Sequence, residues 1–507
     1  MLKKTFAVAL SLCLIIGLCG CGELQQNTPS SSEEDQSSQI TSSAEKDDKE
    51  DEKDNNNKKD PLMTKDYTNP SIYTLDTLVS MGLESPRKSD KAIDKAADKM
   101  LKTIEARPDT LKPKAGGKYI YVATGGTDGK GYGYSTQKPV ATIAYANLLA
   151  KSGDVVVLKR GNMWRENVVG KEGVSYGAYG KGNKPTIYGS KKNYADVKWS
   201  AEGENVYRVQ TGTASDIGLI VFDHGKACGS KVWKKESLKR DYDFVCIGGY
   251  VYVYLTKGNP AELYSDIEIC VTQHVVKLKS NSTIQNWRIM YGGAHGVGMV
   301  DANNVEFDGC VVGYIGGGLQ GGAGLNTRYG NGIEIWGECD GYIIRNCHVY
   351  QCYDAGITMQ YVGSKTEQNI LFENNLLEYS VYNIEYFLSG GTFKNILIQN
   401  NIVRHGGYGW GYYSRPNKNR GTNVSGGCAT YNENFVYKNN IFDHSKSFLL
   451  SINGSGGFYP TFKGNTFAQK GGFRICIWDG KNYGMKKHGE EALNNVFKDL
   501  TGKLITY

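Results

Sequence analysis

Apolar positions recur at helical spacing only in the N-terminal part of the chain, within residues 68–115. One face of this predicted helix consists of Ile93, Ala97, Met100, Leu101 and Ile104. Charged residues fill the opposite face, and Arg107-Pro108 would end the helix. We therefore expect a short N-terminal helical segment that packs over the start of the main domain.

From residue 116 onwards the pattern changes to short apolar runs separated by glycine-rich turns, which is typical of β-strands. Residues 119–122 and 153–158 are such runs, and we assign 116–190 to a cap and the first coils of the main domain. The runs within 191–275 do not follow the spacing found later and predict a small β-rich insert. The chain contains 64 Gly and 35 Tyr but only 11 Pro, which agrees with many strands and tight turns.

A repeat of about 25 residues over 276–507 determines the fold class. Seven segments align, each with an apolar position shortly after a shared column. That column is Trp287, Cys310, Cys347, Asn375, Asn401, Asn440 and Asn465. One turn of a parallel β-helix returns the chain about 4.8 Å higher, where stacked Asn side chains can hydrogen-bond along the column. The sequence therefore predicts an all-β protein, a solenoid of parallel β-helix type.

A second column runs beside the first. Strand alternation sends one set of side chains inward, namely Val297, Ile333, Ile357, Ile384 and Cys428. The next positions then point outward on one face, namely Gly298, Glu334, Thr358, Glu385 and Ala429. Beside them lie Trp336, Gln360, Phe387 and Tyr431, with His295 one coil earlier and Asp354 at the mouth of the same strand.

This outward column places two carboxylates in register, which is what glycoside hydrolysis requires. Glu334 and Glu385 are two coils apart, about 9.6 Å between backbones. Inverting enzymes separate their carboxyl groups by about 6.5–9.5 Å and retaining enzymes by about 5–5.5 Å, so the estimate favours inversion. Asp354 with either glutamate is the competing pair. The alternative is that both glutamates are ordinary solvated strand residues.

Two intervals of the repeat are long, and loops that leave a regular stack often carry function. The first loop, 316–330, contains Arg328, and the second, roughly 406–426, contains Trp410 and Arg415. Aromatic faces together with arginine suit the binding of sugar rings. The alternative is that the second loop packs on itself.

Two stretches carry a resemblance to known proteins: 328–336 (RYGNGIEIW) and 353–360 (YDAGITMQ). Together with the order of strands in 118–166, they resemble bacterial right-handed parallel β-helix proteins of the pectin-lyase-like type, often grouped with glycoside hydrolases. The resemblance covers about 118–470. It implies a right-handed β-helix and a carbohydrate substrate, while the fold itself hosts several chemistries.

The main alternative activity is that of a polysaccharide lyase acting on a uronate polymer. Such a reaction needs a Lys or Arg base, often with Ca²⁺. The column from Gly298 to Ala429 has no Lys or Arg, which argues against it, and no cofactor is expected for a hydrolase. A third reading is a non-catalytic wall-binding protein or adhesin. In each case the partner is a polysaccharide rather than a nucleic acid, and we expect a monomer.

The first residues predict export. Lys3 and Lys4 precede an apolar stretch, 6–18, which leads to Cys21 in a four-residue match to the bacterial lipobox. We expect 1–20 to be a lipoprotein signal peptide and Cys21 to carry lipid. The alternatives are a plain secretory signal or an uncleaved anchor. Residues 21–67 are mostly low-complexity and polar, and would tether the folded part outside a Gram-positive membrane.

Charge and cysteine content refine this reading. The formal net charge of the whole chain is +7. Residues 30–60 contribute −6 and residues 1–29 contribute +1, so residues 61–507 contribute +12. A basic folded part suits an anionic partner or is simply an alkaline surface. Nine Cys follow Cys21, an odd number without zinc-site spacing. Most should be small buried side chains, and Cys310 and Cys347 either stack or form a disulfide between coils.

Overall fold

The computed structural model describes residues 90–321, 324–416, 421–427, 431–454 and 459–507. All of them belong to one compact unit, residues 67–507. The predicted signal peptide, Cys21 and the polar tether lie outside the described residues. Among the residues described, no helix is both long enough and apolar enough to cross a membrane.

Three sheets of ten strands each form the main body. The first contains β1 (Tyr119–Val122), β2 (Val155–Lys159), β5 (Ser175–Tyr179), β16 (Ser282–Gln285), β19 (Val305–Asp308), β22 (Cys339–Arg345), β25 (Thr366–Glu373), β28 (Thr392–Gln399), β31 (Tyr431–Lys438) and β34 (Thr461–Lys463). The second contains β3 (Met163–Trp164), β6 (Thr186–Tyr188), β17 (Arg288–Gly292), β20 (Val311–Ile315), β23 (His348–Cys352), β26 (Leu376–Glu378), β29 (Ile402–Gly406), β32 (Ile441–Ser445), β35 (Thr466–Gln469) and β38 (Lys503–Thr506). The third contains β4 (Val168–Val169), β15 (Val276–Lys277), β18 (Val297–Gly298), β21 (Ile333–Trp336), β24 (Ala355–Val362), β27 (Tyr382–Ser389), β30 (Thr422–Gly427), β33 (Phe448–Asn453), β36 (Arg474–Trp478) and β37 (Lys481–Gly484).

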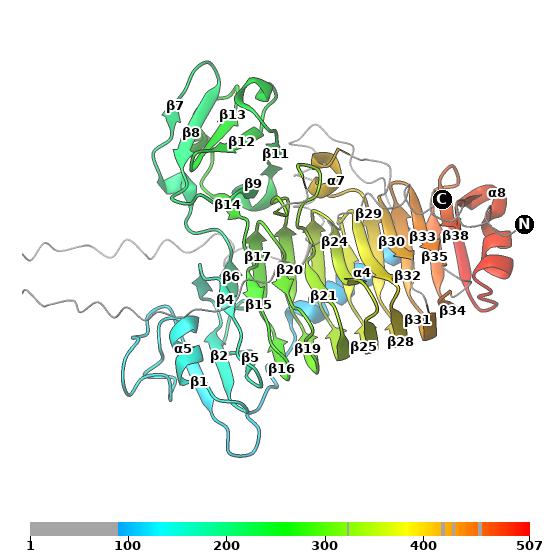
Figure 1. Cartoon of the computed structure of the whole chain (residues 1–507), viewed down its shortest axis with the longest axis horizontal. Coiled ribbons are helices and arrows are strands. Elements are labelled where there is room, and N and C mark those ends of the chain that lie inside the picture. Colours follow the sequence, from blue (N-terminus) through cyan, green and yellow to red (C-terminus); the bar gives the residue numbers. More distant parts are fainter. Residues whose placement is uncertain (1–89, 322–323, 417–420, 428–430, 455–458) are drawn as a thin grey trace, which may run out of the picture. The chain divides into compact units, whose positions relative to one another are not determined.

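The chain visits the sheets in turn, so that β22, β23 and β24 form one coil and β25, β26 and β27 form the next. Neighbouring coils pair in parallel, and Figure 1 shows their strands stacked side by side from β15 to β33. Inward side chains of all three sheets make one continuous apolar core. The predicted all-β parallel β-helix is confirmed.

The predicted Asn column is a ladder of buried amides at the bend between the first and second sheets. Asn375 Nδ2 donates to Asn401 Oδ1 at 2.9 Å, and Asn401 Nδ2 donates to Asn440 Oδ1 at 2.9 Å. Asn440 Nδ2 then donates to Asn465 Oδ1 at 3.0 Å, and Asn465 Nδ2 donates to Asp499 Oδ2 at 3.0 Å. Each amide thus satisfies a polar group on the next coil, which stabilises a buried bend.

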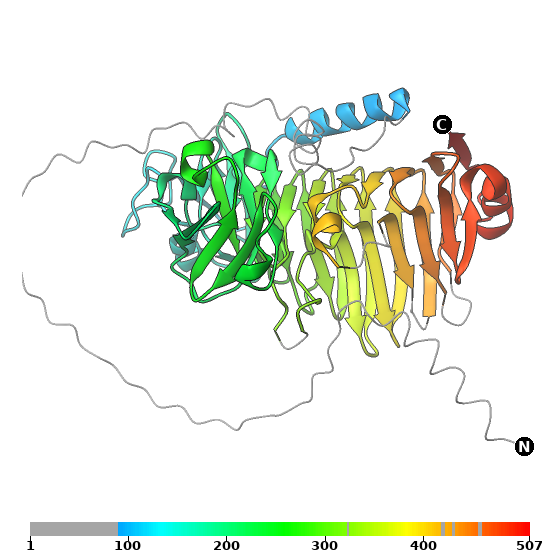
Figure 2. The same cartoon turned by 90° about the horizontal axis from the view of Figure 1, so that it is seen from above.

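The predicted N-terminal helix is α4 (Lys91–Glu105), which Asp90 caps by accepting from the N–H groups of Ala92 and Ile93. We expected it over the start of the main domain. Instead it runs along the stack, because Glu105 pairs with Arg288 of β17 and Asp94 pairs with Arg404 of β29. Figure 2 shows α4 lying alongside the coils.

The residues predicted as an insert form two small sheets with their own apolar core. One sheet consists of β7 (Ser200–Ala201), β8 (Val206–Gln210), β11 (Ser230–Lys231), β12 (Asp243–Ile247) and β13 (Tyr250–Tyr254). The other consists of β9 (Ile217–Phe222), β10 (Ala227–Cys228) and β14 (Ile267–Val271). The described helices outside the insert, besides α4, are α5 (Ile143–Leu149), α7 (Trp410–Ser414) and α8 (Met485–Glu491), whereas α6 (Pro260–Leu263) belongs to the insert.

The cysteines of the described residues are all free thiols, and all but Cys246 are buried. Cys310 and Cys347 therefore stack rather than form a disulfide. Cys347 also lies at the start of the Asn ladder, because its N–H donates to Asn375 Oδ1 at 2.9 Å.

Candidate active site

The outward face of the third sheet carries the two predicted carboxylates. Ile333, Ile357 and Ile384 point into the core, and the residues that follow them point away from it. Glu334 pairs with Thr358, and Thr358 pairs with Glu385, so the three lie in register on adjacent strands. At about 4.8 Å per strand the two glutamate backbones are about 9.6 Å apart. All three side chains are nevertheless largely buried, with exposures of 8%, 0% and 7%.

Glu334 is held by two neighbours. His295 Nε2 lies 3.0 Å from Glu334 Oε1, and Asn331 Nδ2 donates to the same oxygen at 3.2 Å. The backbone N–H of Asn331 donates to His295 Nδ1 at 3.0 Å, which places the imidazole proton on Nε2, facing the carboxylate. Burial raises the pKa of Glu334, but the interactions with His295, with smaller contributions from His274 and Asn331, more than offset it and hold the pKa below its usual range. Glu334 is therefore ionised at neutral pH.

A second histidine, not predicted as a site residue, completes this cluster. The rings of His274 and His295 stack with centroids 5.0 Å apart, and Tyr329 meets the edge of both. Burial, and then the neighbouring His295, lower the pKa of His274 to about 4, so it is neutral at physiological pH. The sequence does contain a signal for it, because His274 and His295 each stand two residues before paired valines, Val276 and Val297.

Gly298 makes room for the stacked histidines. It stands in the outward column one coil before Glu334, since Val297 pairs with Ile333. A Cβ atom at Gly298 would lie 3.0 Å from His274 Nδ1, tighter than an ordinary contact. The small residue thus leaves space for the ring of His274, which stacks on His295.

Glu385 is oriented by Gln360, whose Nε2 donates to Glu385 Oε2 at 2.6 Å. Gln360, Trp336 and Phe387 occupy the next outward row, in register with one another and half-buried. The Trp336 ring meets Tyr361 edge-on at 5.7 Å. The structure thus brings a polar amide and two aromatic side chains beside the carboxylates, as the sequence predicted.

Asp354 does not join this group. Arg415 Nη2 lies 3.0 Å from Asp354 Oδ1, and the Arg415 guanidinium stacks over Tyr353 at 5.1 Å. Asp354 immediately precedes β24 and stands four residues before Thr358, roughly 13 Å along an extended chain. The competing pairing of Asp354 with a glutamate is therefore disfavoured by position.

Two predicted substrate contacts lie elsewhere. Trp410 is 1% exposed, with Nε1 donating to the backbone oxygen of Gln351 of β23 at 2.8 Å, so the predicted ring face is inaccessible because this loop packs against the coils. Tyr431 belongs to β31 of the first sheet, opposite Thr392. The outward column continues from Glu385 to Ser425, because β30 begins at Thr422 rather than near Gly427. Cys428 and Ala429, which we had aligned with it, lie outside the described residues.

The column also extends in the other direction. Lys277 of β15 pairs with Gly298 of β18, which places an exposed lysine two coils before Glu334. The expectation of a column without Lys or Arg holds only from Gly298 onwards.

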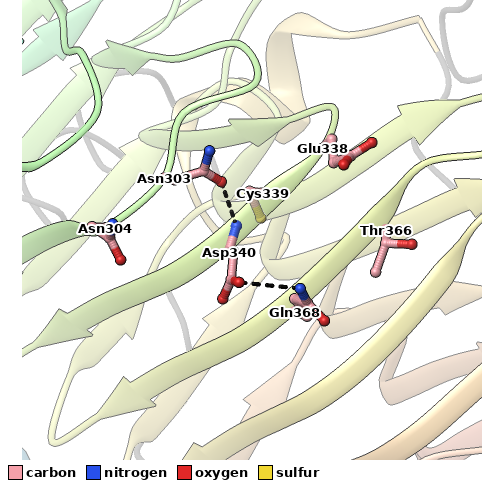
Figure 3. A pocket seen from close by; sticks show the side chains of 7 residues that line it. All are labelled: Asn303, Asn304, Glu338, Cys339, Asp340, Thr366 and Gln368. Carbon is pink, nitrogen blue, oxygen red and sulfur yellow. Dashed lines mark hydrogen bonds between the residues drawn. The ribbon is translucent and has the colours of Figure 1, made fainter.

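A separate polar pocket of about 390 Å³ lies beside the ends of β21 and β22. Its lining residues are Asn303, Asn304, Glu338, Cys339, Asp340, Thr366 and Gln368 (Figure 3). Asp340 is bound on two sides, because its N–H donates to Asn303 Oδ1 at 2.8 Å and its Oδ2 accepts from Gln368 Nε2 at 3.1 Å. None of the predicted catalytic residues lines it. Within the described residues, no three His, Cys, Asp or Glu side chains are grouped to hold a metal ion.

Comparison with known proteins agrees with this architecture. Residues 275–467 match the family described as right handed beta helix region. No curated protein matches the sequence. A solved structure of XylC with xylose has 14% sequence identity and a TM-score of 0.50, covering 71% of this chain and 68% of that chain. Pectate lyase Pel9A (11%, TM-score 0.41, covering 71% and 76%) and a GH136 lacto-N-biosidase from Eubacterium ramulus (11%, TM-score 0.32, covering 77% and 68%) are also similar. At 14% identity the likeness to XylC is one of fold.

Proposed function

We propose that this right-handed parallel β-helix protein is a carbohydrate-active enzyme of the cell surface, a glycoside hydrolase that uses Glu334 and Glu385. The observation that carries the proposal is the in-register pair itself: two largely buried carboxylates on one outward face, with Thr358 between them. Glycoside hydrolysis needs one carboxyl group on each side of the scissile bond.

The surroundings of the two carboxylates suggest different roles for them. Glu334 has a lowered pKa, so it suits the general base that removes a proton from the attacking water. Glu385 then serves as the acid that protonates the leaving oxygen. The backbone separation of about 9.6 Å favours the inverting reaction, which leaves room for that water. His295 acts as a positioning residue for Glu334.

The half-buried aromatic side chains offer a place for the sugar. Trp336 and Phe387 lie one outward row beyond the carboxylates, with Gln360 between them. Aromatic faces stack on the apolar faces of sugar rings, and the amide fixes hydroxyl groups. A polysaccharide chain lying along this row would present its glycosidic bond to the column of Glu334.

The proposal is tested on a panel of polysaccharides by measuring released reducing ends. Glu334→Gln and Glu385→Gln should each lower kcat by about 10²- to 10⁴-fold, the usual contribution of a general acid or base. Glu338→Gln in the separate pocket is the matched control and should retain activity. Hydrolysis that survives both glutamate substitutions would rule out this site.

A lyase reaction is the second candidate, because Lys277 stands in the same column two coils before Glu334. A lysine base could take the proton next to a uronate carboxyl group. The same panel separates the two reactions, since a lyase yields products that absorb in the ultraviolet. Unsaturated products that disappear with Lys277→Met would favour the lyase.

We further propose that lipid on Cys21 anchors the protein outside the cell. The support is the lipobox-like sequence at Leu18–Cys21 and the polar tether that follows it. Cys21→Ser should release the protein into the medium, as immunoblotting of cell and supernatant fractions would reveal. A variant that stays with the cells would contradict anchoring through this residue.

A further inference from the structure

A second cluster lies where Arg328 meets Trp233 of the insert. Arg328 is only 7% exposed, and its guanidinium stacks on Trp233 at 4.8 Å and on Tyr353 at 5.1 Å. Its Nε and Nη1 are buried and donate no hydrogen bond to any described residue. Trp233, by contrast, is 37% exposed and borders the cluster on the solvent side.

The acidic groups around Arg328 are already engaged. Asp216 pairs with Lys231 and accepts the N–H of Leu319 at 2.7 Å. Asp354 pairs with Arg415 at 3.0 Å. Among the described residues the cluster therefore holds one positive charge more than its acids balance, and that charge is on Arg328.

Arg328 cannot become neutral by losing its proton. Burial lowers the pKa of Arg328, but a guanidinium remains charged throughout the physiological range. A buried charge without a partner is strongly unfavourable. The cluster is therefore suited to receive an anion, which would satisfy the charge and the open donors together.

We propose that Arg328 binds the carboxylate of an acidic sugar, so that the substrate is a uronate-containing polysaccharide. The planar donors of a guanidinium match a carboxylate. Arg328 and Glu334 stand on one continuous segment, at most roughly 20 Å apart between Cα atoms, so an acidic sugar at Arg328 would lie within a few sugar units of the cleavage point. The +12 balance of residues 61–507 also favours an acidic polymer. The identity of the polymer as a substrate, though not its binding, rests on the proposed function.

Binding is measured apart from cleavage, by affinity electrophoresis of the full chain carrying Glu334→Gln. The probes are polygalacturonate, alginate and glucuronoxylan, each beside its carboxyl-reduced derivative, with dextran sulfate as a sulfated polymer. At least one uronate polymer should bind about 10- to 100-fold more tightly than its reduced form, as expected for charge-assisted hydrogen bonds. Arg328→Gln should remove that preference and leave binding of the reduced polymer unchanged. Arg474→Gln, an exposed arginine of β36, removes the same charge and should stay within about twofold of the parent, because exposed charges contribute little.

Arg328→Lys keeps the charge but loses the planar donors, so it serves if Arg328→Gln does not fold by circular dichroism. It should lose about tenfold of the preference, and an unchanged preference would overturn the proposal. Equal binding of acidic and reduced polymers by the parent would overturn it too. Dextran sulfate held through Arg328 as tightly as any uronate would overturn the carboxylate assignment. If Glu334→Gln shows the uronate preference but the parent with Glu334 releases no reducing ends, the binding site is supported and the proposed hydrolase activity is ruled out.

Discussion

The Asn ladder and the carboxylate column are both rows of buried polar side chains in register, yet they are satisfied in opposite ways. In the ladder each Asn is bonded by an Asn on the next coil, until Asp499 ends the row. In the column Glu334 is bonded by His295 and Asn331, which come from other rows, and Thr358 Oγ1 makes no hydrogen bond with any described residue. Side chains that hydrogen-bond to one another along a row stabilise the fold. Side chains whose hydrogen-bond partners lie outside the row are available to take part in chemistry.

Breaking the ladder should give the largest effect. Asn401→Ala removes the bonds to Asn375, Asn440 and the backbone oxygen of Phe372, leaving several buried groups unpaired. We expect the free energy of unfolding in urea to fall by about 4 kcal/mol, at about 1–3 kcal/mol for each unpaired group.

The matched control for the ladder is Asn395, which joins an exposed row of Asn residues. It donates to Asn369 and accepts from Asn434, each at 3.1 Å, with φ of 53°. Asn395→Gly keeps this left-handed backbone and should cost less than about 1 kcal/mol, because water replaces the lost bonds. Equal losses at both positions would contradict the distinction between buried and exposed rows.

The second-largest effect is expected when His295, the neighbour of Glu334, is removed. His295→Ala should lower kcat roughly 100-fold, about 2.7 kcal/mol, because the carboxylate loses its orientation and ionises less readily. The pKa of Glu334 would rise, since burial is then less opposed, so the acid limb of the kcat/KM profile moves to higher pH. His488→Ala in α8 is the control and should leave the profile in place.

A third buried glutamate, Glu367, extends the comparison, because burial alone shifts its pKa. Glu367 points into the core between Cys339 and Phe393, is fully buried, and makes no hydrogen bond to the described residues. Burial raises its pKa well above the ordinary value, so the folded protein keeps a proton that the unfolded chain releases.

Folding stability should therefore fall as the pH rises above the unfolded-state pKa of about 4.3, by up to about 1.4 kcal/mol per pH unit until the folded-state pKa is reached. Glu367→Met should remove this slope, so the variant is more stable than the parent at pH 8 and loses that advantage near pH 4. Glu338→Gln, at an exposed site, should follow the parent. Urea titrations at several pH values measure the difference, and parallel curves for parent and Glu367→Met would contradict it.

The smallest effect is expected at Thr358. Thr358→Val exchanges a buried hydroxyl without a hydrogen bond for a methyl group of the same shape. The free energy of unfolding should stay constant or rise by less than about 1 kcal/mol, because no bond is lost. A clear loss of stability would mean that the column is satisfied like the ladder.

Much of the fold could be predicted because coils repeat. The spacing of the Asn column and the alternation of Ile and Glu at 333–334 and 384–385 reflect constraints that recur at every turn. Errors arose where the repeat is interrupted. Tyr431 was misplaced because Gly426-Gly427 imitates the start of a strand that in fact begins at Thr422. The burial of Trp410 depends on Gln351, which lies 59 residues away, and no local pattern reports that contact.

The site was predicted only in part, for the same reason. The register of Glu334 and Glu385 follows from the repeat, but the hydrogen bond from Asn331 and the ring stack of His274 depend on the path of a loop. Arg328 was singled out by its residue type, whereas its contact with Trp233 joins segments about 95 residues apart. Contacts between an insert and a loop do not recur with the coils, so the repeat in the sequence cannot predict them.

The Asn ladder has a direction, since every hydrogen bond between its side chains is donated toward the C-terminal coil and the last of them goes to Asp499. An ionised carboxylate accepts hydrogen bonds but does not donate them, so Asp499 accepts the last hydrogen bond of the row and donates none. The ladder is therefore a row of hydrogen-bonded amides that ends at Asp499, and further coils can be inserted before that end. A duplicated coil that carries Asn at this position could be spliced in ahead of Asp499 without changing how the row ends, which would make the length of the solenoid a free variable in protein engineering.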